Sequence, residues 1–197
     1  MKISRVGKFG EVQLNVFLKK LIKDDYFLLE NLLIPIKDSE YKTEIDKLLI
    51  SQKGIFCIEV KYWGGYLSGS EYGDWTQTQY MYGFKRTRKL PNPVTQNCMH
   101  AKALANLLCN ESRIFNIVLL TGYSKRNIKS LNVYDLATFR GLYRGLGKCI
   151  SEDEVKILYL TLSKYVASNE ELVKHAAEVN KYYKNKRNKP SFEFVDD

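Results

Sequence analysis

The chain has 197 residues, of which 45% are hydrophobic and 27% charged, and this globular composition excludes a fibrous or wholly disordered protein. No apolar run reaches the ~18 residues of a membrane helix, and the first residues lead into no apolar signal-peptide core, so we expect a cytoplasmic protein without a membrane partner. Thirty-one basic against twenty-two acidic residues give a net charge of +9, which favours an anionic partner such as nucleic acid.

The first expected element is an amphipathic helix over residues 8–23. Its apolar residues recur at helical spacing, namely Leu14, Phe17, Leu18 and Leu21. Glu11 precedes this stripe by about one turn, so its carboxylate stands at the head of the apolar face. Glu11 is either an acid favoured by the helix dipole in the first turn or part of a site.

Three strands are expected next, over residues 26–36, 44–51 and 55–62, and Gln52-Lys53-Gly54 between the last two indicates a hairpin. Two registers are open. A turn at Gln52-Lys53 sets Asp46 across from Glu59, and a turn at Lys53-Gly54 sets Asp46 across from Lys61.

Alternation along the strands separates charged from apolar side chains in both registers. One face is expected to carry Glu44, Asp46, Glu59 and Lys61. The other is expected to carry Ile45, Leu49, Phe56, Ile58 and Val60, interrupted by Lys47.

Two carboxylates opposed on neighbouring strands lie ~5 Å apart at their Cβ atoms and repel each other. A divalent cation between them would relieve the repulsion. The alternative is an ordinary salt bridge of Lys61 with Glu59 or Asp46 on a solvated face.

The cysteines and histidines restrict the metals that the chain can hold. The four cysteines show no CxxC spacing, which is typical of reduced thiols in the cytosol, and Cys98-Met99-His100 is too short a cluster for zinc. With two histidines in the chain, a metal would need oxygen ligands, which points to Mg²⁺ or Mn²⁺.

The middle of the chain combines turns with positive charge. Residues 66–83 indicate a further hairpin, and the basic stretch 85–89 follows, with interleaved Tyr80, Tyr82 and Phe84 that could stack on bases. The alternative for the basic stretch is a solvated loop.

The remaining elements are expected to be mainly helical. Asn92 caps a helix that begins at Pro93. The other expected elements are a strand covered on both faces at 114–121, a short strand at 131–134, a weak helix at 135–143, and a capped helical pair at 151–166 and 169–184. The basic residues of 181–189 are expected to form a solvated helix end.

The motifs in this order resemble the nuclease-related domain (NERD) family of the PD-(D/E)XK nuclease superfamily. The resemblance covers residues 5–125. The matching motifs are Gly7-Lys8-Phe9-Gly10-Glu11, Glu44-Ile45-Asp46, the run from Gly54 through Glu59-Val60-Lys61 to Gly65, Trp75, and Asn92-Pro93-Val94-Thr95-Gln96. Tyr62 departs from the usual Asn or Ser after the E-x-K motif.

The resemblance implies an α/β fold with a restriction-endonuclease-like α-β-β-β-α-β core, a central mixed sheet flanked by helices. We expect a nuclease-like domain at 1–147, and the helical pair, which lies outside the resemblance, is expected as a C-terminal helical extension at 148–197 packed on it.

The resemblance also implies a metal-dependent nuclease, acting on DNA rather than RNA. By this likeness, Mg²⁺ or Mn²⁺ is held by Asp46, Glu59, the Val60 carbonyl and Glu11, while Lys61 and Gln96 assist the water and the phosphate. The expected nucleic-acid-binding residues are Lys85, Arg86, Arg88 and Lys89. The alternative is a non-catalytic nucleic-acid-binding or scaffolding module that retains the fold.

Overall fold

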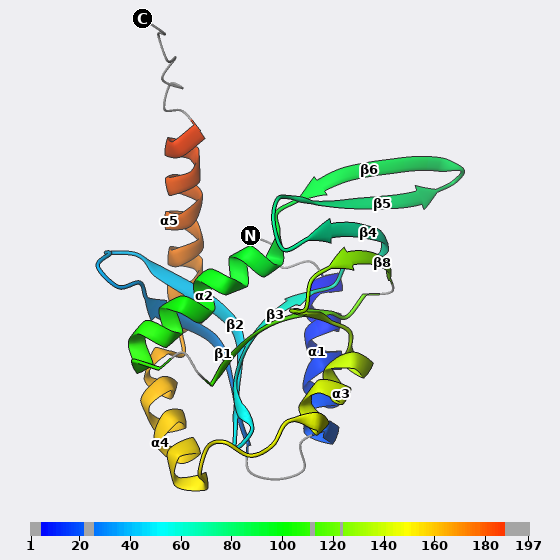
Figure 1. Cartoon of the computed structure of the whole chain (residues 1–197). Coiled ribbons are helices and arrows are strands. Elements are labelled where there is room, and N and C mark those ends of the chain that lie inside the picture. Colours follow the sequence, from blue (N-terminus) through cyan, green and yellow to red (C-terminus); the bar gives the residue numbers. More distant parts are fainter. Residues whose placement is uncertain (1–4, 22–25, 111–112, 123, 188–197) are drawn as a thin grey trace, which may run out of the picture. The chain divides into compact units, whose positions relative to one another are not determined.

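The computed structural model of the chain describes residues 5–21, 26–110, 113–122 and 124–187, without the side chains of 5–11, 13 and 183–187 (Figure 1). The chain divides into two compact units, with the boundary after Val166. In the described part of the second unit, the regular element is one helix.

The helices of the first unit begin where capping residues are available. Ser151, as expected, accepts a hydrogen bond from the backbone of Glu154, and Asp135 with Thr138 forms a capping box. The helices are α1 (Arg5–Leu21), α2 (Pro93–Leu108), α3 (Leu136–Gly145) and α4 (Glu152–Leu162), followed by the short 3₁₀ helix η1 (Ser163–Tyr165). In the second unit, α5 (Asn169–Arg187) follows the expected capping box of Ser168 and Glu171.

The strands form two mixed sheets, and the fold predicted from the sequence is confirmed. The first sheet has the order β1-β2-β3-β7-β9 and the second β6-β5-β4-β8. The strands of the first sheet are β1 (Tyr26–Pro35), β2 (Lys42–Ser51), β3 (Gly54–Lys61), β7 (Ile114–Leu120) and β9 (Val133–Tyr134). Those of the second are β4 (Gly65–Ser70), β5 (Trp75–Met81), β6 (Phe84–Leu90) and β8 (Ser124–Lys129).

The β2–β3 hairpin adopts the first of the two expected registers. Ser51 pairs with Gly54, so Gln52 and Lys53 form the turn. Gly54 has a φ of +138°, and a Cβ there would stand 2.5 Å from the Phe115 ring, so only glycine fits. The register directs Asp46 toward Glu59, one step beyond the last ladder pair, Lys47 with Ile58.

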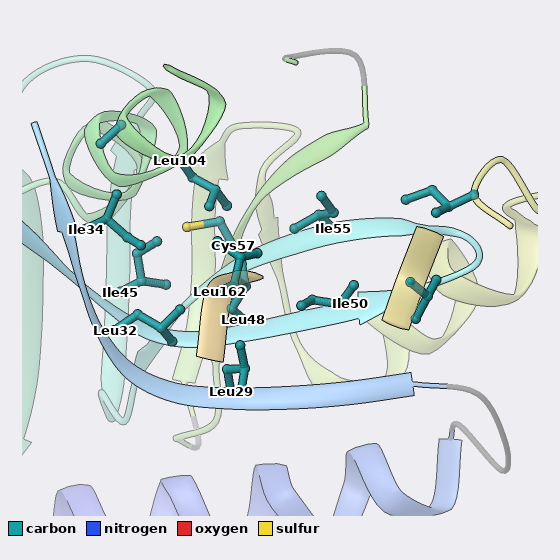
Figure 2. Close-up of a cluster of buried hydrophobic side chains, with 13 residues drawn as sticks. Leu29, Leu32, Ile34, Ile45, Leu48, Ile50, Ile55, Cys57, Leu104 and Leu162 are labelled. Carbon is teal, nitrogen blue, oxygen red and sulfur yellow. The ribbon is translucent and has the colours of Figure 1, made fainter. Parts of the chain in front are cut away.

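The expectation that Ile45 lies on the face opposite Glu59 is wrong. Ile45 packs with Leu48 and Cys57 in the cluster beneath α2 (Figure 2), whereas the intervening Lys47 forms an ion pair of 2.8 Å with Glu30. Glu30 also accepts a hydrogen bond from Asn15 of α1, which places Lys47 on the opposite face.

The exchange of faces coincides with an irregularity in the β1–β2 ladder. Asn31 has a φ of 56°, a left-handed conformation that asparagine tolerates, and it interrupts the pairing opposite Asp46. Beyond this point Thr43 and Ile45 face α2, so Glu44 does not share a face with Glu59, contrary to the expectation.

Three hydrophobic clusters fill the first unit. One lies under α2 and α4, where Val155 and Leu162 of α4 join Leu104 of α2 (Figure 2). A second lies between the first sheet and helices α1 and α3, and a third joins the two sheets around Trp75 and Val118. Strand β7 is therefore covered on both faces, as its apolar run predicts.

The second sheet differs most from the sequence expectation. The basic stretch 85–89 is part of strand β6, which contradicts the alternative of a loop, and β8 is a strand where no apolar alternation predicts one. Strand β8 pairs in parallel with β4, so it forms through a contact between segments that are distant in the chain. Among the described residues, no helix has both the length and the apolar character needed to cross a bilayer.

Candidate functional site

Asp46 stands where the ladder between β2 and β3 ends. Its Oδ2 accepts a hydrogen bond of 3.3 Å from the backbone N–H of Val60. The carboxylate thus reaches the neighbouring strand at the position where a further backbone bond would form.

Glu59 is the buried acid of the site, with 1% of its surface exposed. Lys61, two residues on, shares its face and forms an ion pair with its Oε1. Its Oε2 is buried and has no hydrogen-bond partner among the described residues. The salt bridge considered as the ordinary alternative is therefore present, but on a buried face, and it leaves one carboxylate oxygen available for a ligand.

Sequence reasoning missed His100, which lies beside this acid. His100 is buried on α2, its Nδ1 contacts the hydroxyl of Thr43, and its Nε2 lies 3.9 Å from Oε2 of Glu59. The signal in the sequence is its spacing of four residues from Gln96, which places both on one side of the helix.

The pKa of the buried Cys57 thiol reflects the charges of the site. Burial raises its pKa well above the ordinary value, and the negative charges of Glu59 and Asp46 raise it further. Both carboxylates therefore lie within electrostatic reach of the same point on β3. This negative potential is what a small cation would neutralise.

Two asparagines fix α2 against the sheets. Asn92, the expected N-cap, accepts hydrogen bonds from the backbone of Val94 and Thr95, and its amide donates to the carbonyls of Ser70, Glu71 and Gly73. Asn97 is buried and donates to the carbonyls of Cys57 and Ile117 and to the side chain of Asn116. The helix is thus held to β3 and β7 beside Glu59.

The other expected site residues lie at the margins of this cluster. Gln96 is exposed in the first turn of α2, one turn before His100. The side chain of Glu11 lies outside the described residues, although its backbone belongs to α1.

The basic residues of β6 divide between two faces of the second sheet. Arg88 donates from Nε to the buried Gln77 over 2.6 Å, and Arg86 alternates onto the same inner face. Lys85 and Lys89 alternate onto the outer face. The expected binding cluster is therefore split into two pairs.

The inner face adjoins the site through tryptophan. The Nζ atom of Lys61 lies 5.9 Å from the ring centroid of Trp63, whose ring is 6.1 Å from that of Trp75. Gln77 in turn donates to the carbonyl of Gly64 over 2.7 Å. The arginine pair thus faces the side of the sheet that continues from Lys61.

The donor set fits a hard cation. Within the described ranges no three His, Cys, Asp or Glu side chains gather closely enough to hold a metal by themselves. Asp46 and Glu59 nevertheless supply carboxylate oxygens, one of them buried without a hydrogen bond, and the Val60 carbonyl lies between Glu59 and Lys61 in the chain. Oxygen donors of this kind suit Mg²⁺ or Mn²⁺.

Comparison with known proteins adds an independent observation. The sequence pattern of a family described as "nuclease-related domain" matches residues 6–134, which run from α1 to β9. An uncharacterized protein of Bacillus anthracis is 30% identical over 165 residues, covering 79% of this chain and 74% of the relative. No solved structure matches the chain.

Proposed function

Because this chain belongs to the nuclease-related domain family, we propose that it is a metal-dependent nuclease that hydrolyses phosphodiester bonds in nucleic acid, with DNA as the substrate. The observation that supports this proposal best is Glu59, a buried carboxylate with one oxygen held by Lys61 and the other without a hydrogen-bond donor among the described residues. A cytoplasmic location is part of the proposal.

In this proposal Mg²⁺, or Mn²⁺, is held by Asp46, Glu59 and the carbonyl of Val60, with Glu11 as a further ligand. When bound, such an ion lowers the pKa of a coordinated water and polarises a phosphate oxygen. The hydrogen bond from Val60 N–H to Asp46 holds the first carboxylate near β3.

The other residues act on the substrate and the water. The ammonium of Lys61 orients the attacking water and offsets the charge that develops on the phosphate. Gln96 lies exposed in the first turn of α2, at the end of the helix where the dipole favours an anion, so it positions the scissile phosphate.

Binding of the substrate is assigned to Lys85, Arg86, Arg88 and Lys89 of β6. Arg86 and Arg88 lie on the face that adjoins the site. Neutralising all four should reduce the slope of log K against log[salt] by roughly 3, because each lost phosphate contact removes about one released counterion.

The test is a cleavage assay with purified full-length chain on supercoiled plasmid, linear duplex, single-stranded DNA and RNA, with Mg²⁺, Mn²⁺ or EDTA. We expect metal-dependent cleavage, reduced by a factor of about 100 or more in Asp46→Asn, Glu59→Gln and Lys61→Ala, because each change removes a ligand or a charge used in the reaction. The matched controls are Asp74→Asn and Lys102→Ala, which alter exposed residues outside the site.

Unchanged cleavage in Asp46→Asn and Lys61→Ala would refute the assignment. Nucleic-acid binding without cleavage under any metal condition would instead favour the non-catalytic module. Thermal unfolding of each variant separates loss of activity from loss of fold, since removing one partner of the buried pair of Glu59 and Lys61 also costs stability.

A further inference from the structure

The outer face of the second sheet is an exposed surface of hydroxyls, tyrosines and lysines. Side chains alternate between the two faces of a strand, so the strand pairings show which residues of each of the four strands lie on this face. We define the outer face by Tyr66 and Ser68 of β4; Thr76, Thr78 and Tyr80 of β5; Lys85, Thr87 and Lys89 of β6; and Lys125, Asn127 and Lys129 of β8.

The four strands of this sheet carry only positive charge. They contain seven lysines and arginines and no acidic residue. Two lysines lie on the outer face of each edge strand, four residues and therefore about 13 Å apart. The lysines on β6 and β8 form no ion pair with any described residue, so their charge is available to an anionic partner.

Two tyrosines lie between the lysine-bearing edges. Tyr66 pairs across the strands with Thr78, and Tyr80 is the next residue on the same face of β5, so the two tyrosines are diagonal neighbours about 7 Å apart, within reach of each other's long side chains. Tyr66 is 42% exposed and Tyr80 72% exposed. Hydroxyl and amide side chains surround them, which suits contacts with sugars and phosphates.

The hairpin of β5 and β6 extends this surface beyond β4 and β8 (Figure 1). At its turn Tyr82 is 94% exposed, and Phe84, which alternates onto the inner face with Arg86, is 78% exposed. Large aromatic side chains in water on a strongly basic hairpin indicate a ligand that has both negative charges and flat apolar faces.

We propose that the outer face binds single-stranded nucleic acid, with unpaired bases stacked on Tyr66 and Tyr80 and the backbone held by Lys85, Lys89, Lys125 and Lys129. A duplex offers phosphates but keeps its base faces stacked, so it can use the lysines and not the tyrosines. Four-stranded sheets with exposed aromatics bind single strands in this way in other proteins. The proposal names the substrate form for the proposed nuclease, and for that purpose it rests on the proposed function.

The test measures binding in EDTA, where no cleavage occurs, by fluorescence anisotropy of the full-length chain with labelled 12-nucleotide single-stranded DNA, single-stranded RNA and duplex DNA. We expect the Tyr66→Ala/Tyr80→Ala variant to bind single strands roughly 30-fold more weakly and duplex as the wild type does. The Tyr66→Phe/Tyr80→Phe variant should bind normally, because phenylalanine keeps the stacking surface.

A second variant tests the lysines. Changing Lys85, Lys89, Lys125 and Lys129 to glutamine should reduce the single-strand salt slope by about 3. The charge-matched control changes Lys37, Lys102, Lys148 and Lys164, all exposed and outside the second sheet, and should leave the slope unchanged.

The outcomes separate this proposal from the proposed function. Alanine variants that bind single strands as tightly as the wild type, or a wild type that prefers duplex, would overturn the outer-face proposal even if the chain cleaves DNA. Single-strand binding that depends on the two tyrosines would support the outer-face proposal even if the chain cleaves no nucleic acid and the proposed function fails. The DNA and RNA arms identify which single strand binds.

Discussion

At the residue scale, the site depends on a few side chains that hold each other in a buried environment. Glu59 is surrounded by Lys61 and His100, and Asp46 is held by a backbone N–H. His100 Nε2 lies 3.9 Å from Oε2 of Glu59, and we propose that His100 acts as a positioning residue for this acid.

We expect His100→Ala to reduce cleavage and to raise the Mg²⁺ concentration for half-maximal activity by a factor of about 10–100, as is usual for residues that orient a metal ligand. Thr43→Val, which removes the hydroxyl beside His100 Nδ1, should shift Mg²⁺ dependence in the same direction. The control is His175→Ala on α5, which should change neither quantity. A change in stability without a change in Mg²⁺ dependence would contradict the positioning role.

The raised pKa of Cys57 gives a pH prediction. Burial, then the charges of Glu59 and Asp46, keep this thiol protonated in the folded chain, whereas in the unfolded chain it ionises near pH 8.5. Its contribution to stability is therefore complete below pH 8.5 and is lost as the pH rises above it, by up to about 1.4 kcal/mol per pH unit.

Urea unfolding between pH 7 and pH 10, in a reducing buffer, measures this slope. Cys57→Ala is expected to lower stability at every pH but to flatten the alkaline decline. Parallel pH profiles of the wild type and the variant would show that another group causes the decline.

At the scale of elements, the start of α2 connects the two sheets with the candidate site. Asn92 caps the helix and ties it to the turn between β4 and β5 through three carbonyls. Asn92, together with Asn97 further along the helix, therefore holds Gln96 and His100 in position.

Asn92→Ala should destabilise the chain by about 2–4 kcal/mol, because it removes the cap and three buried hydrogen bonds. Asn92→Ser keeps a capping oxygen and should recover about 1 kcal/mol of this loss. Chemical denaturation measures both variants. Equal stability of Asn92→Ala and wild type would mean that the helix start does not depend on this side chain.

At the scale of the whole molecule, every residue of the three hydrophobic clusters lies between Leu14 and Tyr165. Ile150, Val155 and Leu162 belong to the cluster beneath α2, so α4 contributes to the core. The expected domain boundary between residues 147 and 148 stays a prediction, and truncation tests it.

A chain ending at Val166 should keep its unfolding temperature within about 4 °C of the full chain, since it retains all three clusters. A chain ending at Gly147 should lose about 5 kcal/mol or more, because the cluster beneath α2 loses three buried aliphatic side chains and the apolar surface that they cover becomes exposed. Differential scanning calorimetry distinguishes the two truncations. Cooperative unfolding of the shorter chain at the full-length temperature would show that residues 1–147 suffice.

The sequence by itself determined the features that rest on neighbouring residues. The turn residues predict the β2–β3 hairpin and limit it to two registers, Asn92-Pro93 starts α2, and apolar runs mark β1 and β7. The motif resemblance to the nuclease-related domain family is confirmed by the match over residues 6–134. Turn chemistry, capping and periodicity are local properties, so a sequence contains them directly.

Only the tertiary structure decided which groups face one another. The faces of Glu44 and Ile45 change where the left-handed Asn31 interrupts the β1–β2 ladder, and α2 brings His100 to Glu59, 41 positions earlier in the chain. Strand β8 forms by pairing with β4, and alternation in β6 splits its basic residues. These placements depend on contacts between segments that are distant in the chain. A local sequence pattern does not predict the energies of such contacts.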